Sequence, residues 1–319
     1  MVKLTSVLSV LTTIVAVTLI FYAPFNNTEL ENSFNNYVSQ FSKSYNSKTE
    51  FDFRMQVFKD NMEQARILQE QNPLARFGAT IFSDQTEQEM LQRMGDIEVD
   101  ADITPNEIFT ETSKTSGNID WSRSFQPIQN QGQCGSCWAF AATATYEAYV
   151  KELRQDSTKY SEQELVDCVP TCSGCNGGLA HLGYQWLSQG NQFCTEASYP
   201  YEMKDANCRS STCGGKSTDA GFGIVQGGES AMINKLSEGP LSVSVDASVW
   251  HSYQDGVLTS CGQATNHAVV VMKYTEDNDG KTWTIRNSWG PQWGEQGHIR
   301  LRFGDNVCNV SRRPSYPTF

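Results

Sequence analysis

The stretch Gln131-Gly132-Gln133-Cys134-Gly135-Ser136-Cys137-Trp138 guides the interpretation of the whole chain. Cys137 opens an apolar run that continues with helical spacing to about Leu153. Its sulfur would therefore lie at the positive end of a helix, where a thiolate is stabilised. A thiol has an ordinary pKa of about 8.5 and needs such help at neutral or acid pH. The pattern predicts a nucleophile at Cys137, although burial or a disulfide is the commoner fate of a secreted cysteine.

Length and charge limit the class of protein. The chain has 319 residues, which is enough for about two domain-sized units, and a formal net charge of -12. Nucleic acids and anionic membranes bind basic protein faces. We therefore expect neither as a partner and interpret the charge as a solvated acidic surface.

The N-terminus has the pattern of a secretory signal peptide, which we place at residues 1–24. Lys3 precedes a mostly apolar run over Leu4–Tyr22. The run also approaches the length of about 20 residues that spans a bilayer, so a retained anchor is the alternative, weakened by Thr12, Thr13 and Thr18 inside the run. We expect a route through the secretory pathway to a lysosome-like acidic compartment or to the extracellular space. No stable membrane span is expected once the signal is removed.

The ten cysteines all lie between Cys134 and Cys308. In a secreted chain this number indicates disulfides. It also separates a cysteine-free front from a cross-linked remainder. The sequons at Asn26 and Asn309 are candidate glycosylation sites in that compartment.

Residues 25–114 are predicted to form a separate front unit. Apolar residues recur with helical spacing between Leu30 and Glu70, which predicts two amphipathic helices, the second ending at Asn72-Pro73. A short extended piece is expected over Ala79–Phe82. Residues 95–118 are rich in Asp, Glu, Thr and Ser and are predicted to be an exposed linker that contains the maturation boundary.

Residues 115–319 are predicted to form an α+β domain. Helical sequence comes first, with a capping box at Ser161-Glu162-Gln163-Glu164 that starts a short helix ending near Cys168. Short apolar strands follow. They are expected at Leu241–Val245, Ala268–Tyr274, Trp283–Arg286 and His298–Phe303.

The segment around Cys137 closely resembles papain-like cysteine peptidases, the cathepsin L branch in particular. His267 follows Cys137 by 267 - 137 = 130 residues and Asn287 follows it by 287 - 137 = 150, which fits the spacing of about 130 to 150 in that family. The resemblance implies a two-lobed fold. A helical lobe would carry Cys137, a β-barrel-like lobe would carry His267 and Asn287, and the cleft would lie between them.

The resemblance also implies catalytic roles. His267 would pair with Cys137 as thiolate and imidazolium and later protonate the leaving amine. Asn287 would orient the imidazole, and Trp289 would shield that hydrogen bond from water. Gln131 would bind the developing oxyanion together with the Cys137 N–H. The other three histidines lack the flanking residues of the family pattern.

A substrate-binding set follows by the same local matching. Gly177 and Gly178 would pair with an extended substrate through their backbone. The pocket for the residue before the cleaved one would be lined by Leu179, Ala180, Ser244, Ala268 and Arg313. Arg313 is unusual there and could admit an acidic or polar side chain instead of a bulky apolar one. The equal alternative is that Arg312 and Arg313 point to solvent.

The front unit resembles the inhibitory propeptide of cathepsin L-like zymogens. The matching residues are Glu50, Arg54, Val57, Phe58 and Asn61, followed by Gly78, Phe82 and Asp84. Ala65, Gln69 and Thr80 depart from the family motif. The resemblance implies a segment that covers the cleft until acid weakens its carboxylate contacts.

The family pattern implies three disulfides. They join Cys134 with Cys175, Cys168 with Cys208, and Cys261 with Cys308. Cys172, Cys194 and Cys213 then leave one pair and one odd thiol, and we favour Cys194 with Cys213, although spacing does not decide this.

We therefore predict a cysteine endopeptidase made as a zymogen, without metal or organic cofactor. Its partners would be protein or peptide substrates, its own propeptide and cystatin-like inhibitors. One alternative treats Cys134 and Cys137 as a redox pair, or as zinc ligands with Cys168, Cys172 and Cys175. A catalytically silent homologue that acts as a binding module, and an exopeptidase, are two others.

Overall fold

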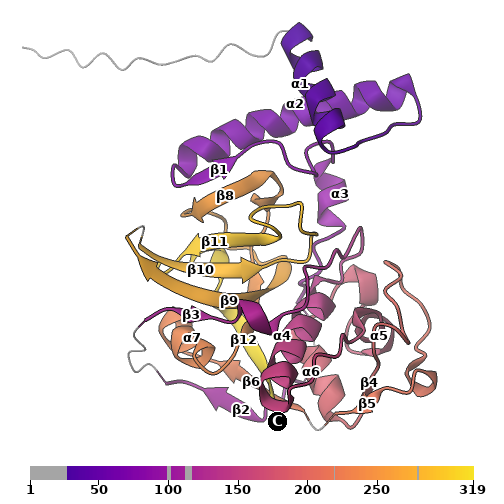
Figure 1. The fold of residues 1–319 in the computed structure, drawn as a ribbon, viewed down its shortest axis with the longest axis vertical. Helices are drawn as coiled ribbons and strands as arrows, with labels where there is room; N and C mark the ends of the chain where they lie inside the picture. Colours follow the sequence, from indigo (N-terminus) through magenta and orange to yellow (C-terminus); the bar gives the residue numbers. More distant parts are fainter. Residues whose placement is uncertain (1–26, 99–101, 112–116, 219, 279) are drawn as a thin grey trace, which may run out of the picture.

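The structure is a computed structural model that describes residues 27–98, 102–111, 117–218, 220–278 and 280–319. The predicted signal peptide and the sequon at Asn26 lie outside these residues. We call residues 27–98 the front segment and residues 117–319 the body. In Figure 1 the helices of the front segment stand on the β lobe of the body, at the end opposite the C-terminus.

The front segment contains the two expected helices, α1 (Asn27–Gln40) and α2 (Lys48–Gln71). Their apolar faces meet in a cluster centred on the buried rings of Phe34, Tyr37 and Phe58. Ser47 caps α2 by accepting a hydrogen bond from the Glu50 N–H, and the helix ends at Asn72 as predicted. These helices are therefore held together by their own small core.

The extended piece of the front segment lies earlier than predicted. The strand is β1 (Ala75–Phe77), whereas a turn closed by the Ser83 N–H and the Thr80 carbonyl follows it. Helix α3 (Glu87–Leu91) comes next and begins with a complete capping box of Thr86 and Glu89. The cross-strand pairing of β1 with the body decides the position of the strand, and local sequence does not show that pairing.

The helical lobe of the body consists of α4 (Cys137–Arg154), α5 (Glu162–Cys168) and α6 (Ala180–Ser188). Nearly all of α4 is buried because it lies between α6 and the sheet. The lobe also has four short elements. They are η2 (Gly174–Asn176), η3 (Ser210–Thr212), β4 (Gln192–Phe193) and β5 (Lys216–Ser217).

The β lobe is one antiparallel-rich sheet with the order β1-β8-β11-β10-β9-β7-β12-β6-β2, with β3 beside β9. Four of its strands confirm the sequence prediction: β7 (Leu241–Val245), β9 (His267–Asp277), β10 (Gly280–Arg286) and β11 (His298–Arg302). The others are β3 (Ile119–Asp120), β6 (Gly221–Val225), β8 (Tyr253–Leu258) and β12 (Arg312–Thr318). The remaining helical elements are η1 (Ser122–Ser124), α7 (Gly228–Leu236), η4 (Trp250–Ser252) and η5 (Val307–Asn309). The strand order is open, so the sheet is not closed into a barrel.

Both ends of that strand order come from one stretch of chain. β1 pairs with β8, and β2 (Glu107–Phe109) pairs in parallel with β6. The prediction of an exposed linker over residues 95–118 is therefore wrong for two parts: Gly95 and Asp96 are buried, and residues 107–109 form a strand. The acidic composition concealed pairing that depends on the body.

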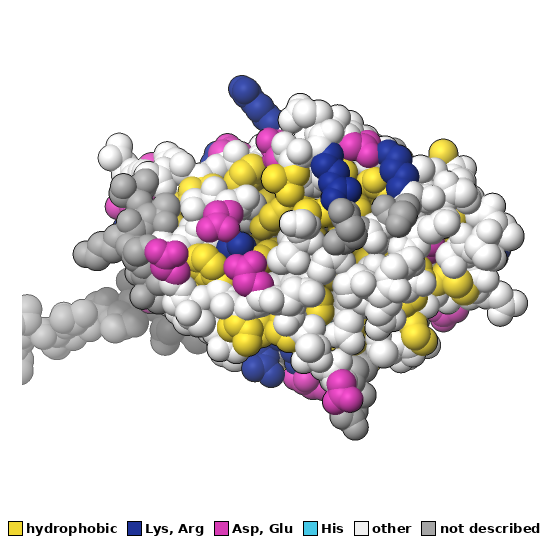
Figure 2. Space-filling view, turned by 90° about the horizontal axis from the view of Figure 1, so that it is seen from below, with side chains coloured by type: hydrophobic (Ala, Val, Ile, Leu, Met, Phe, Trp, Pro, Cys, Tyr) yellow, Lys and Arg dark blue, Asp and Glu magenta, His cyan; other side chains and the backbone are white. Residues whose placement is uncertain are grey.

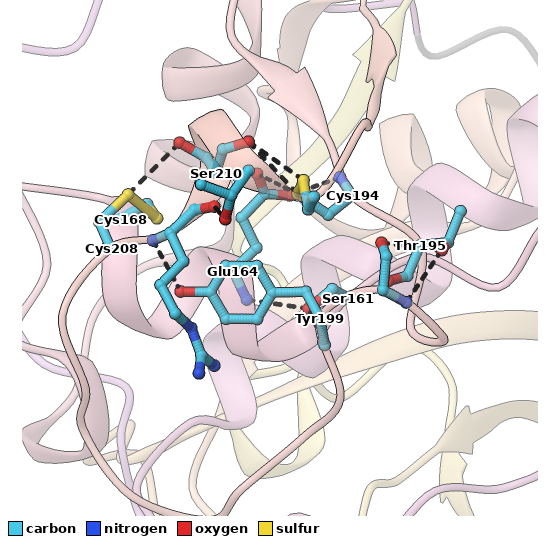
Figure 3. Close-up of a disulfide and its surroundings, with 12 residues drawn as sticks. Ser161, Glu164, Cys168, Cys194, Thr195, Tyr199, Cys208 and Ser210 are labelled. Carbon is cyan, nitrogen blue, oxygen red and sulfur yellow. Dashed lines mark hydrogen bonds between the residues drawn. A yellow bond between two sulfur atoms is a disulfide. The ribbon is translucent and has the colours of Figure 1, made fainter.

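Four disulfides cross-link the body. They join Cys134 with Cys175, Cys168 with Cys208, Cys194 with Cys213, and Cys261 with Cys308. Figure 3 shows the region around Cys194, whose N–H donates to the Glu164 carboxylate (2.6 Å). The predicted capping box of α5 is consequently only half formed, because the Ser161 N–H donates to the Cys194 carbonyl (3.0 Å) instead of to Glu164.

The surface agrees with the acidic composition. Figure 2 views the end opposite α1 and α2, where charged side chains of both signs lie scattered among uncharged ones. Lys and Arg side chains do not form one continuous patch on the part of this face that is described. Among the described residues, no helix combines the length and apolar character that crossing a bilayer requires.

Candidate active site

Cys137 is the first residue of α4 and is completely buried. Its Sγ accepts a hydrogen bond from the Ala268 N–H at 3.4 Å. The backbone of Gly95, which belongs to the front segment, also acts on the sulfur by lowering its pKa. The sulfur therefore lies at the N-terminal end of an 18-residue helix, between the two lobes and underneath the front segment.

His267 faces Asn287 across the β lobe. The distance from His267 Nε2 to Asn287 Oδ1 is 2.7 Å, and the Ser288 N–H also donates to this Oδ1 at 2.8 Å. An amide oxygen only accepts hydrogen bonds, so Nε2 carries the proton and Nδ1 has a lone pair. Nδ1 is buried and has no hydrogen-bond partner among the described residues. The tautomer is therefore the one in which Nδ1 can accept a proton.

Two tryptophans enclose the imidazole. The ring centroids of His267 and Trp289 are 4.9 Å apart, and those of His267 and Trp250 are 6.2 Å apart. Both tryptophan side chains are buried. They exclude water from the bond between His267 and Asn287, which is the position expected for Trp289.

Gln131 is fully buried beside the loop that precedes Cys137. Its Nε2 donates to the Cys134 carbonyl and to the Arg93 carbonyl, both at 2.9 Å. Its Oε1 accepts from the Ser288 hydroxyl at 2.7 Å, which fixes which end of the amide faces the cleft. The donor that was expected to bind a substrate oxyanion therefore binds a carbonyl oxygen of the front segment.

Burial determines the charge state of the covered site. Desolvation raises the pKa of Cys137 to about 12, against smaller lowering effects of the backbone hydrogen bonds. Desolvation also lowers the pKa of His267 to about 4, although the hydrogen bond to Asn287 acts in the opposite direction. Both groups are therefore neutral at ordinary pH. The thiolate and imidazolium pair expected from the sequence is not the favoured state while the front segment covers the cleft.

The front segment passes through the cleft as an extended strand. The Gly178 N–H donates to the Gly95 carbonyl at 2.8 Å, and Asp96 forms a parallel bridge with Gly178. A Cβ atom on Gly95 would lie 1.7 Å from the carbonyl oxygen of Gly135. Only glycine allows so close a passage over the loop that precedes Cys137. The backbone of Gly177 and Gly178, proposed for substrate, here faces the front segment.

The predicted pocket residues come from both lobes. Leu179 and Ala180 are buried at the start of α6, and Ala268 pairs with Ser244 between β9 and β7. Arg313 contacts Ser244, with 3.4 Å between Nη1 and the hydroxyl oxygen. Its side chain is 15% exposed, whereas that of Arg312 is 51% exposed. Arg313 therefore points inward and Arg312 outward.

The front segment is braced by its own polar contacts. Arg54 forms a two-pronged ion pair with Glu89, with distances of 2.7 and 2.8 Å. Asn61 donates to the carbonyls of Ser83 and Gln85. These contacts hold α3 and the turn before it against α2.

Two departures from the family motif also make defined contacts. The Gln69 side chain donates to the Ala75 carbonyl and accepts from the Phe77 N–H, so it bridges both ends of β1. The Thr80 hydroxyl donates to the His251 carbonyl at 2.5 Å and thereby joins the front segment to the body. The replacements therefore preserve docking.

Several residues of the site were missed from the sequence. Asp96 enters the pocket, Ser288 holds the Gln131 amide, and the Tyr201 hydroxyl donates to the Gln131 carbonyl at 2.8 Å. Ser288 could have been found because it lies inside the motif Asn287-Ser288-Trp289-Gly290. A capping box followed by Met94-Gly95 was the available signal for the cleft passage.

The cysteine arrangement excludes the metal and redox alternatives proposed from the sequence. Cys134 is bonded to Cys175 and not to Cys137, so the two cysteines of the Cys-x-x-Cys motif are not a redox pair. Cys137 and Cys172 are the free cysteines. Glu164 lies near Cys194 and Cys213, but those two are joined and offer no thiolate.

Comparison with known proteins agrees with this geometry. Residues 115–318 match the family described as papain family cysteine protease, and residues 34–90 match the cathepsin propeptide inhibitor domain. A cysteine proteinase of Trypanosoma brucei brucei is 35% identical over 301 residues, covering 90% of this chain but 66% of that protein. Cathepsin L 2 of Paramecium tetraurelia is 31% identical over 294 residues, covering 90% and 92%.

Solved precursor structures have the same architecture. Digestive procathepsin L 3 from the larval midgut of Tenebrio molitor superposes with a TM-score of 0.78 at 28% identity, covering 91% of this chain and 99% of that one. A recombinant stem bromelain precursor gives 0.80 at 29% identity with the same coverage. The chain belongs to the papain family of cysteine proteases and has a cathepsin-type inhibitory propeptide, which the front segment forms.

Proposed function

We propose that Cys137, His267, Asn287 and Gln131 are the catalytic residues of this cysteine protease. The observation that carries the proposal is the fixed tautomer of His267. Asn287 holds the Nε2 proton, which leaves Nδ1 as a base, and the neighbouring Ala268 N–H contacts the Cys137 sulfur. The ring and the sulfur thus face one cleft from the two lobes.

The reaction is acyl transfer through a thioester. His267 takes the thiol proton, the Cys137 sulfur attacks the peptide carbonyl carbon, and the C–N bond breaks as His267 gives the proton to the leaving amine. Water then attacks the thioester, with His267 taking one of its protons and returning it to the sulfur. Gln131 Nε2 and the Cys137 N–H stabilise the oxyanion in both steps.

The covered state supports latency by two effects. The Arg93 carbonyl occupies the Gln131 donor, and burial keeps both the thiol and the imidazole neutral. Removal of the front segment restores water to the cleft and reverses the desolvation that raises one pKa and lowers the other. The thiolate and imidazolium pair is then stabilised by the helix N-terminus.

The remaining assignments follow from this role. The domain boundaries are residues 1–24 for the signal, 25–114 for the propeptide and 115–319 for the peptidase. Gly177, Gly178, Leu179, Ala180, Ser244, Ala268, Trp289 and Arg313 bind protein or peptide substrates, and the same cleft accepts cystatin-like inhibitors. Four disulfides and cathepsin-like relatives support a secretory route to a lysosome-like or extracellular destination.

Active-site titration tests the proposal. Processed protein should bind one equivalent of a thiol-directed epoxide, and Cys137→Ser should abolish both the labelling and hydrolysis, by at least about 10⁴-fold. Cys172→Ser is the matched control, because Cys172 is the other free cysteine, and it should still bind one equivalent. No labelling and no hydrolysis by folded, processed wild-type protein would instead indicate a binding module.

A further inference from the structure

An acidic side chain of the front segment fills the pocket beside the cleft. The Asp96 side chain is 1% exposed. Its Oδ1 accepts from the Ser244 hydroxyl at 2.8 Å, and its Oδ2 accepts from Arg313 Nη1 at 3.2 Å. Its own N–H donates to the Asn266 carbonyl at 3.1 Å. Asp96 is thus held by the backbone, a hydroxyl and a guanidinium of the body.

The body aims Arg313 into this pocket through its backbone. The register of β12 shifts between Arg312 and Ser315 against β7, and Arg313 adopts a left-handed conformation with φ of 51°. Such a conformation is unfavourable for a non-glycine residue, and bulges of this kind redirect side chains. The neighbouring Arg312 remains on the outside. The inward guanidinium is therefore a property of the strand and not of a free surface side chain.

The carboxylates that neutralise Arg313 belong to the front segment. Within the described residues, its ion-pair partners are Asp96 and Glu98. The body adds the Ser244 hydroxyl to the pocket, and it adds His181 nearby, whose pKa is lowered to about 4 by burial and by the charge of Arg313. His181 is therefore uncharged at neutral pH. When the front segment leaves, the inward-directed Arg313 guanidinium loses both carboxylate partners, and the carboxylate of a bound substrate can take their place.

We propose that the pocket for the residue before the cleaved one accepts an acidic side chain, and that Arg313 determines this specificity together with Ser244. The inference rests on the proposed function. Asp96 shows the fit, because it directly follows Gly95, whose carbonyl accepts from the Gly178 N–H, and itself forms the bridge with Gly178. In a bound substrate, the side chain one residue away from the reacting carbonyl would reach the pocket that Asp96 occupies here. Asp96 thus places a carboxylate in the proposed substrate pocket, where the acidic side chain of a substrate would lie.

The charge state of such a group permits an ion pair at neutral pH. Burial raises the pKa of Asp96 to about 6, with the Ser244 hydrogen bond and the charge of Arg313 opposing this rise. The carboxyl is therefore ionised at pH 7, where it pairs with Arg313. At pH 7, a comparison of Glu and Gln substrate peptides therefore compares an ionised carboxylate with an uncharged amide.

The test uses enzyme processed from the full chain and four peptides that differ only at the residue before the cleaved one: Glu, Gln, Leu or Arg. Wild-type enzyme should cleave the Glu peptide with kcat/KM about 10- to 100-fold above the Gln peptide. Arg313→Gln should lose this preference, so that its kcat/KM values for the Glu and Gln peptides become about equal. Arg313→Glu should favour the Arg peptide. Arg312→Gln is the matched control and should keep the wild-type ratio.

The outcomes separate the two proposals. Cleavage of the Leu and Gln peptides without a preference for Glu would overturn the role of Arg313 and leave the catalytic assignment intact. Epoxide titration of each variant counts folded active sites, so a loss of protein is not mistaken for a change of specificity. If wild-type enzyme is neither labelled nor active on any of the four peptides, the catalytic assignment fails and the specificity inference fails with it.

Discussion

The front segment is attached to the body in two places by different kinds of contact. Over residues 72–82 it docks on the β lobe through the pairing of β1 with β8 and through Phe82, which packs edge-on against Trp289 with ring centroids 5.7 Å apart. Over residues 93–98 it crosses the cleft through a carbonyl, a glycine and two acidic side chains. The first attachment is mainly apolar and backbone-mediated, so it should respond to packing. The second should respond to charge and steric fit.

The largest expected effect comes from the apolar attachment. Phe82→Ala should destabilise docking of the front segment by about 3 to 5 kcal/mol, because it removes a buried ring that contacts both Trp289 and the Arg93 guanidinium. Hydrogen exchange of the β1 amides in full-length Cys137→Ser protein measures this change. Phe53→Ala is the control, since Phe53 is 52% exposed. Equal exchange rates of the β1 amides in Phe82→Ala and Phe53→Ala would contradict the apolar character of the first attachment.

Gly95→Ala should break the cleft attachment while the docked part stays in place. The new methyl carbon meets the Gly135 carbonyl at 1.7 Å, and we expect a cost of about 1 to 3 kcal/mol. Unprocessed protein should then hydrolyse a peptide reporter about 10- to 100-fold faster than the wild-type proform. The exposed neighbour Gln92 provides the control as Gln92→Ala. A variant that stays as latent as the wild type would show that the passage tolerates a side chain.

Acid should loosen the brace of Arg54 and Glu89, with a smaller effect. The hydrogen bonds from Arg54 lower the pKa of Glu89 from 4.5 to about 2. The contribution is therefore present above pH 4.5 and is lost as the pH falls toward 2. Because the pair is partly exposed, we expect about 1 kcal/mol. Thermal unfolding of Glu89→Gln and wild type, both as Cys137→Ser proteins, should differ at pH 6 and converge near pH 2. Glu70→Gln, at an exposed ion pair, should show almost no difference at either pH.

Asp96 should behave in the opposite way. Its pKa is raised to about 6 by burial, so the docked state binds a proton more tightly than the free state, and acidification from pH 7 to about 4 strengthens this contact. The charged groups that act on it are Arg313, Arg312 and Glu98. Release by acid must therefore come from carboxyls with lowered pKa, such as Glu89 and Glu98. The expectation that acid weakens all carboxylate contacts is wrong for Asp96.

The smallest effect belongs to the surface. Arg76 forms an ion pair with Asp255 beside the docked strand, but both side chains are well exposed, 65% and 41%. Arg76→Ala should change the unfolding free energy by less than about 0.5 kcal/mol. Chemical denaturation of full-length Cys137→Ser protein measures it. A loss approaching that of Phe82→Ala would mean that charge also holds the first attachment.

Local sequence was sufficient where one element determines its own form. Helix α4 begins at Cys137 and β7 spans Leu241–Val245, as their apolar patterns predict. Cys137, His267 and Asn287 were proposed as catalytic residues from motif and spacing, and the fold brings their elements together. Sequence reasoning failed where a distant partner decides the structure. β1 forms by pairing with β8, the Glu164 carboxylate accepts from the Cys194 N–H, and Asp96 is buried against Ser244 and Arg313 of the body.

The placement of β1 and β2 has a consequence for the protein after maturation. Both are outermost strands of one sheet, where β1 shields β8 and β2 shields β6, and with the proposed boundary at residue 114 both strands would leave with the propeptide. Loss of these shields uncovers backbone donors and acceptors that could recruit strands from other molecules. Maturation therefore removes latency and at the same time increases the tendency to self-associate. Conditions that keep molecules apart, such as the mutual repulsion of strongly acidic chains, should favour a soluble product.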